Sequence, residues 1–194
     1  MSINLLETVQ QNLGYPALQK IDPNTQQVVV DDKTPAEDKF SQAAIPAVLT
    51  ALYRYVQTDE GATAFLRGNN STNWVGQIFD DNKKEVVQTI SAYAKQSNAD
   101  PVEKINAIAT EAVKVVKENL SSDAGVKEVK LFFSNQKNNI LLYLPAALNM
   151  GDLLHDASLD DNTNKMEGPI SSLMQSIGNV FSNTTTDTDV KKQE

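Results

Sequence analysis

The strongest constraint on the fold is the spacing of apolar residues after Asp100. The stretch Asp100-Pro101-Val102-Glu103 is typical of a helix start, because aspartate caps helices and proline is tolerated at the first helical position. Beyond it, apolar residues recur at every third or fourth position up to Val116, which is the period of one face of an α-helix. The opposite face is typical of a solvated surface with local ion pairs. It carries Glu103, Lys104, Glu111, Lys114, Lys117 and Glu118.

The same spacing recurs along most of the chain, so we predict an all-α bundle of about eight helices. Besides the helix after Asp100, the predicted helices cover residues 3–13, 36–55, 59–67, 74–79, 86–94, 126–133, 138–149 and 170–181. We predict that Thr34 caps the helix at 36–55 and that Ser71 caps the helix at 74–79. We also predict that Pro46 kinks or breaks the helix at 36–55, because proline removes a backbone hydrogen bond. Gln26–Val30 looks strand-like, but five residues cannot build a sheet, so we predict an extended connector or a short hairpin arm.

Two short strings are echoed later in the chain. Residues 45–49, IPAVL, resemble residues 144–148, LPAAL, and residues 78–82 loosely resemble residues 180–184. The offsets are similar, so a tandem duplication of one helical unit is one interpretation, and a chance match of apolar strings is the other.

Composition argues against several classes of partner. The chain has 194 residues, a formal net charge of −8 and no cysteine, and its only arginines are Arg54 and Arg67. An acidic surface repels phosphate backbones and anionic lipids, so we expect no nucleic-acid partner and no membrane. No apolar run approaches the roughly 20 residues of a membrane span, and the N-terminus lacks the pattern of a secretory signal, so we expect a cytoplasmic location. Nothing in the sequence indicates a cofactor.

A polar stretch near the C-terminus has the alternating oxygen ligands of a calcium loop. Asp160, Asn162 and Asn164 alternate, and Glu167 follows. An EF-hand loop needs glycine at its sixth position and glutamate at its twelfth, where this chain has Lys165 and Ser171. Asp160, Asn162, Asn164 and Glu167 are therefore a weak candidate site for a divalent cation, and a polar connector between helices is the favoured interpretation.

Aromatic and apolar residues supply the candidate interaction surface. Tyr143 lies in the run Ile140–Leu144, which is apolar on all sides, as in a central or interface helix. Exposed aromatic residues mark binding surfaces, although core packing explains most of these side chains equally well. The candidates are Trp74, Tyr53, Tyr143, Leu173 and Phe181. His155, the only histidine, has no recognisable nucleophile beside it and is interpreted as structural or exposed.

Two stretches resemble the YidB-like family of bacterial proteins, a domain of unknown function. They are KFSQAAIPAVLTALYRYVQTDEGATAFL and NWVGQIFDDNKKEVVQTISAYAKQSNADPVEKINAIATEAV, and the likeness covers roughly residues 36–118. The resemblance implies an all-helical bacterial domain and brings no catalytic residues. We divide the chain into a helical region at residues 1–118, a second helical region packed on it at residues 119–183, and a polar tail at residues 184–194.

The apolar spacing clearly defines the buried and exposed faces of the predicted helices, and the sequence contains no recognised catalytic motif. The leading hypothesis is therefore a non-enzymatic interaction or scaffold protein that forms a homodimer or binds a protein partner. The alternatives are a module that binds a small ligand or a divalent cation, and a hydrolase built on unrecognised carboxylates.

Overall fold

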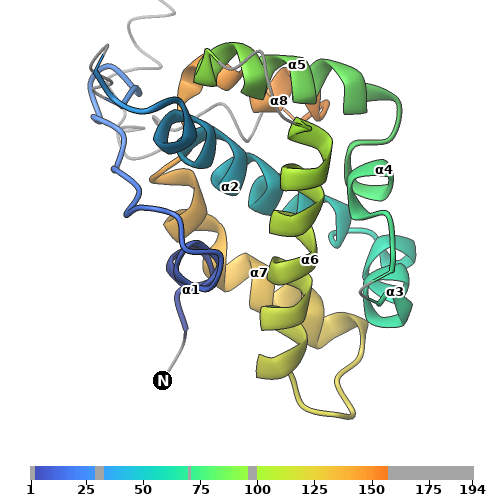
Figure 1. The fold of residues 1–194 in the computed structure, drawn as a ribbon. Coiled ribbons are helices and arrows are strands. Elements are labelled where there is room, and N and C mark those ends of the chain that lie inside the picture. The colour runs from blue at the N-terminus through green and yellow to red at the C-terminus, as the bar shows by residue number, and fades with distance from the viewer. Residues whose placement is uncertain (1–2, 29–32, 70, 96–99, 157–194) are drawn as a thin grey trace, which may run out of the picture. The chain divides into compact units, whose positions relative to one another are not determined.

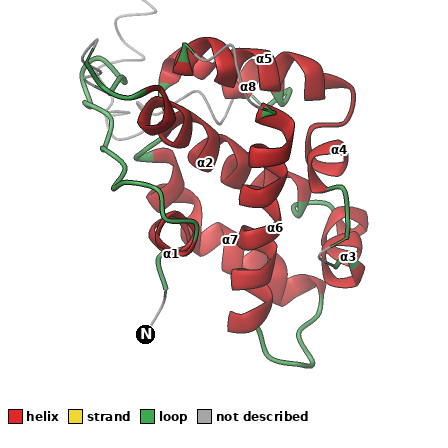
Figure 2. Cartoon of the chain, in the orientation of Figure 1, coloured by secondary structure: helices red, strands yellow, loops and turns green. Residues whose placement is uncertain are grey.

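In a computed structural model, residues 3–28, 33–69, 71–95 and 100–156 are described (Figure 1), and every regular element among them is helical (Figure 2). The α-helices are α1 (Leu5–Asn12), α2 (Ala36–Tyr55), α3 (Asp59–Arg67), α4 (Trp74–Phe79), α5 (Lys83–Ala94), α6 (Pro101–Asn119), α7 (Val126–Leu141) and the single turn α8 (Met150–Leu153). Two short 3₁₀ segments, η1 (Asp80–Asn82) and η2 (Ala146–Leu148), complete the set. The predicted all-α class is confirmed, and the predicted helix number is close to that observed.

Helix α2 forms the centre of the described part. It packs against α1, α4, α5, α6 and α7, and every residue from Lys39 to Leu52 is buried. The helix continues through Pro46 without the break that its sequence allowed. Burial on all sides explains this, because packing against five neighbours holds the segment helical despite one missing hydrogen bond.

Some helices begin at the capping residue that the sequence predicted, and others do not. Asp100 caps α6 as predicted, and its Oδ1 accepts hydrogen bonds from the backbone N–H groups of Val102 and Glu103. The predicted cap of α4 was wrong, since Asn73 and not Ser71 accepts the hydrogen bond from the first turn. The predicted cap of α2 was also wrong, because Pro35 occupies the N-cap position and no side chain caps this helix.

The predicted helix from 138 to 149 is wrong. Helix α7 extends to Leu141, turns follow, and residues 146–148 form η2. Pro145 explains the difference, because it has no N–H to donate and disfavours helical backbone at the residue before it. The echoed strings therefore adopt different structures: 45–49 lies inside α2, whereas 144–148 is an irregular connection at 144–145 followed by η2. The strand-like residues that are described, 26–28, lie in the connection between α1 and α2 and form no strand.

Two buried glutamines hold the N-terminal segment on the bundle through backbone groups. Gln136 of α7 accepts a hydrogen bond from the N–H of Leu5 at 3.0 Å and donates one to the carbonyl of Ile3 at 3.0 Å. Gln42 of α2 accepts from the N–H of Gln19 at 2.8 Å, and it donates to the carbonyls of Gln19 and Tyr143.

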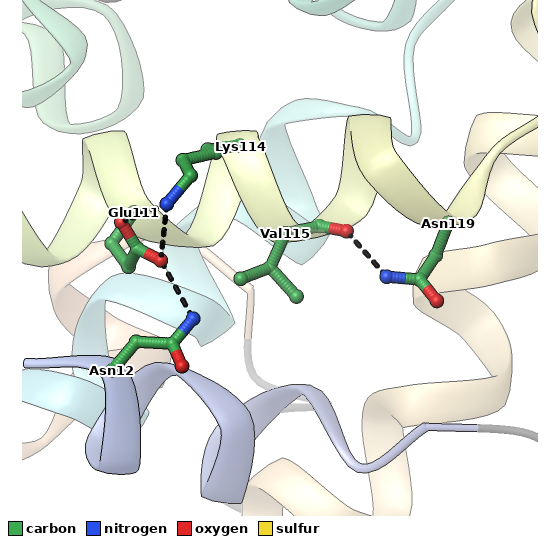
Figure 3. Close-up of polar contacts among 5 residues, drawn as sticks. All are labelled: Asn12, Glu111, Lys114, Val115 and Asn119. Carbon is green, nitrogen blue, oxygen red and sulfur yellow. Dashed lines mark hydrogen bonds and ion pairs between the residues drawn. The ribbon is translucent and has the colours of Figure 1, made fainter.

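A third contact joins the end of α1 to α6. Asn12 Nδ2 donates to Glu111 Oε1 at 2.8 Å, and the same oxygen pairs with Lys114 at 3.2 Å (Figure 3). The Asn119 side chain, further along α6, bonds to its own helix at the carbonyl of Val115. Helix α1 is therefore fixed at both ends, by Gln136 at its start and by Glu111 at its finish.

We expect the Gln136→Leu substitution to lower the free energy of unfolding by about 2 kcal/mol, because it leaves the buried N–H of Leu5 and the part-buried carbonyl of Ile3 unpaired. Asn135→Leu, an exposed neighbour on α7, is the matched control and should change stability by under about 0.5 kcal/mol. Urea unfolding followed by circular dichroism measures both. Equal losses in the two variants would contradict the role given to Gln136.

Candidate functional site

A hollow on the described surface lies over α3 and the end of α4. Its volume is about 630 Å³. It is lined by Asp59, Glu60, Thr63, Ala64, Arg67, Gly68 and Gln77, and we call it the α3–α4 concavity. Five of the seven lining residues are polar or charged, and the concavity is open to solvent, whereas pockets for drug-like ligands enclose most of the ligand surface.

The floor of the concavity is set by the end of α3. Gly68 ends this helix in an extended conformation, and its N–H donates to the carbonyl of Ala64. A Cβ at position 68 would lie 2.3 Å from Cη2 of Trp74, so only glycine lets the chain lie this close to the indole ring. Trp74 itself is fully buried, with its ring centroid 5.9 Å from that of Phe65.

Lys117 of α6 fixes the same helix end from the other side. Its Nζ donates to the carbonyls of Leu66 and Gly68 at 3.0 and 2.5 Å, and it lies 5.8 Å from the centre of the Phe65 ring. A lysine at a helix C-terminus satisfies unpaired carbonyls and complements the helix dipole. Burial lowers the pKa of Lys117. The sequence placed this residue on a solvated face with local ion pairs, whereas its partners lie on another helix.

Acidic and basic side chains both line the walls of the α3–α4 concavity. Asp59 pairs with Lys130 of α7 at 2.6 Å, while Glu60 and Arg67 are exposed. Gln77 accepts a hydrogen bond from the hydroxyl of Tyr55 at 3.1 Å, and burial raises the pKa of this tyrosine. The concavity therefore presents a carboxylate and a guanidinium to solvent on a rigid frame. Next to Lys130 in the chain, Leu131 is the one large apolar side chain classed as exposed in the described residues, at 58%.

The predicted interaction residues do not gather at one surface. Trp74 and Tyr143 are buried, with exposures of 0% and 8%, so their side chains pack in the core. Tyr53 is half-buried on α2, with the Lys137 ammonium 5.4 Å from its ring centre. The other predicted residues lie outside the described residues: Leu173 and Phe181 of the interaction surface, and Asp160, Asn162, Asn164 and Glu167 of the candidate cation site.

The described residues hold no group of three or more histidine, cysteine or acidic side chains with the geometry for a metal ion. His155 is exposed, as its place beside a helix end indicated, and its Nε2 lies 3.4 Å from Nδ2 of Asn82. None of the described helices combines the length and the apolar composition that a membrane crossing needs.

Comparisons of the chain with known protein families, with curated proteins and with solved structures gave no match. The likeness to YidB-like proteins stays a prediction. Arg67 stood out in the sequence as one of two arginines, and the predicted helix 59–67 ended beside Gly68, but no sequence pattern placed either residue in a site. No sequence pattern indicated the contribution of Gln77 or Lys130, because their hydrogen-bond and ion-pair partners, Tyr55 and Asp59, are far from them in the chain.

Proposed function

We propose that this chain is a non-enzymatic interaction protein of the cytoplasm that holds a segment of a protein partner in the α3–α4 concavity. The observation that supports this most is the charge of the concavity, which offers Arg67 and Glu60 to solvent over a fixed floor. Arginine binds carboxylates through two parallel hydrogen bonds and is enriched in protein interfaces. A partner segment that carries both an acidic and a basic side chain would satisfy both walls.

The shape of the site favours a protein segment over a small molecule. Small ligands are bound in pockets that bury most of their surface, whereas this concavity is open to solvent and carries exposed charged side chains on its walls. The lining side chains Glu60 and Arg67 are both exposed, so a segment lying across the concavity can reach both charges. The location in the cytoplasm rests on the sequence alone.

Site-specific photo-crosslinking tests the proposal. A benzoylphenylalanine at Thr63, inside the concavity, should give an adduct with one defined protein in an extract of the source cells. The same probe at Gln88, exposed on α5, is the matched control and should not. Arg67→Glu should weaken the affinity of the purified pair by about tenfold or more, which corresponds to about 1.4 kcal/mol.

Mass spectrometry identifies the partner. An adduct of twice the chain's mass of 21.2 kDa would show that the partner is a second copy. Adducts of equal yield at Thr63 and Gln88, or an affinity that Arg67→Glu leaves unchanged, would contradict the proposal. The hydrolase alternative predicts instead that loss of a carboxylate abolishes turnover of a substrate without changing any protein complex.

A further inference from the structure

Helix α3 buries one face and presents the opposite face in the α3–α4 concavity. On the buried side the helix packs on α7 (Figure 1), where the Phe65 ring meets that of Phe133. The opposite side, which we call the outer face of α3, follows the i, i+3, i+4, i+7 spacing of one helical face. It consists of four residues that line the concavity, Glu60, Thr63, Ala64 and Arg67.

The outer face of α3 carries opposite charges at its two ends. Glu60 lies in the first turn and Arg67 in the last turn, and both side chains are exposed. Seven residues separate them, which is about 10 Å along a helix and beyond the spacing at which neighbouring side chains on a helix pair. Neither side chain forms an ion pair with another described residue. The two positions between them hold the small residues Thr63 and Ala64.

This order of charges makes the outer face complementary to itself. If a second copy of α3 lies antiparallel to the first, with a two-fold axis between Thr63 and Ala64, Glu60 of each copy faces Arg67 of the other. A parallel arrangement would place each charge against its own kind, which is unfavourable. The small side chains at the axis let two helices approach to about 8 Å, the close end of the range for helix packing. A single antiparallel contact therefore forms two identical ion pairs.

The shape of the concavity agrees with the same symmetry. The concavity lies between the outer face of α3 and Gln77 of α4, so α3 is itself one of its walls. In a two-fold arrangement, the α3 helix that borders one concavity fills the concavity of the second copy, and the reverse also holds. The hydrogen bonds of Lys117 to the end of α3 keep this wall in place.

We propose that the partner held in the α3–α4 concavity is a second copy of this chain, in a two-fold dimer formed by antiparallel α3 helices. The inference rests on the function proposed above and names its partner. Helix α3 has 9 residues, a length of about 13 Å, so the contact is small and the dimer is weak and reversible. Exposed ion pairs each contribute little free energy, so they determine the orientation and register of the two helices more than the affinity.

Sedimentation equilibrium of the purified full chain, between about 10 μM and about 1 mM, tests the dimer. Glu60→Arg and Arg67→Glu should each weaken self-association by about tenfold or more, because each variant places two pairs of like charges in the contact. An equimolar mixture of the two variants should associate again, since one copy then carries two cations and the other two carboxylates. Glu85→Arg, at an exposed position on α5, is the matched control and should associate like the wild type.

The mixture separates a lost contact from a lost fold, because a variant that had only unfolded would not regain association with a second one. A wild-type chain that stays monomeric at about 1 mM would overturn the dimer, as would a dimer that both reversals leave unchanged or a mixture that fails to associate. If the probe at Thr63 then crosslinks a different protein, the function proposed above still holds. If that probe gives no adduct either, both proposals fail.

Discussion

Trp74→Ala is expected to lower the free energy of unfolding by about 3–5 kcal/mol, the range for removing a large buried aromatic side chain. Trp74 is fully buried and packs on Phe65, whose ring in turn meets Phe133 edge-on at 5.6 Å between centroids. The indole also lies directly under Gly68. Its removal therefore opens a cavity beneath the floor of the α3–α4 concavity, and we expect the end of α3 to lose its fixed position.

The measurement uses circular dichroism at 222 nm in urea, because Trp74 is the only tryptophan and its fluorescence disappears in the variant. Trp74→Phe is the control. The indole Nε1 is buried without a hydrogen-bond partner among the described residues, so phenylalanine loses volume but no hydrogen bond and should cost under half as much as alanine. A loss below about 1 kcal/mol for Trp74→Ala would mean that the ring is a surface residue.

Local signals in the sequence were sufficient for the elements that depend on nearby residues. The capping aspartate and the apolar period after it predicted α6, and the structure has both. The predicted helix at 59–67 likewise agrees with α3; in the structure Thr58 accepts a hydrogen bond from Gly61 at its start, and Gly68 follows its end. Caps and periodicity act within a few residues, so they can be read from one segment alone.

The errors arose where distant parts of the chain compete with local preference. Pro46 lies inside the continuous helix α2 because the surrounding helices bury this segment. No local sequence pattern predicts that burial. The opposite happened after α7, where a uniformly apolar run suggested a helix up to 149 but Pro145 ended it. Apolar composition alone did not decide between a buried helix and a buried turn.

The candidate site was the least predictable part, because its geometry comes from long-range contacts. Lys117 and Lys104 both belonged to the predicted solvated face of α6, yet they reach the end of α3 and Glu37 of α2. Only Lys114 forms the expected local pair, with Glu111. Apolar periodicity predicts which face of its own helix a side chain lies on, but it does not predict which other helix that side chain contacts.

Gly61→Ala is expected to lower the free energy of unfolding by about 3 kcal/mol or more, at the upper end of the cost of overpacking. A Cβ at this position would lie 1.9 Å from the carbonyl oxygen of Tyr55 and 2.9 Å from Thr58 Oγ1. The first of these atoms is backbone at the end of α2, so a side-chain rotation cannot relieve the clash. The end of α2 and the first turn of α3 must separate, and with them the wall of the concavity formed by Asp59 and Glu60.

Gly125→Ala is the matched control, because it introduces the same methyl group at the start of another helix. The nearest atom to a Cβ there is Glu128 Oε2 at 3.4 Å, an ordinary contact with a flexible side chain. Since alanine is a poorer N-cap than glycine, we expect a loss of under about 1 kcal/mol. Urea unfolding compares the two variants, and equal stabilities would contradict the close packing of α2 on α3. If the packing is as described, Gly61→Ala also weakens binding at the concavity, because two of its charged residues follow Thr58 directly.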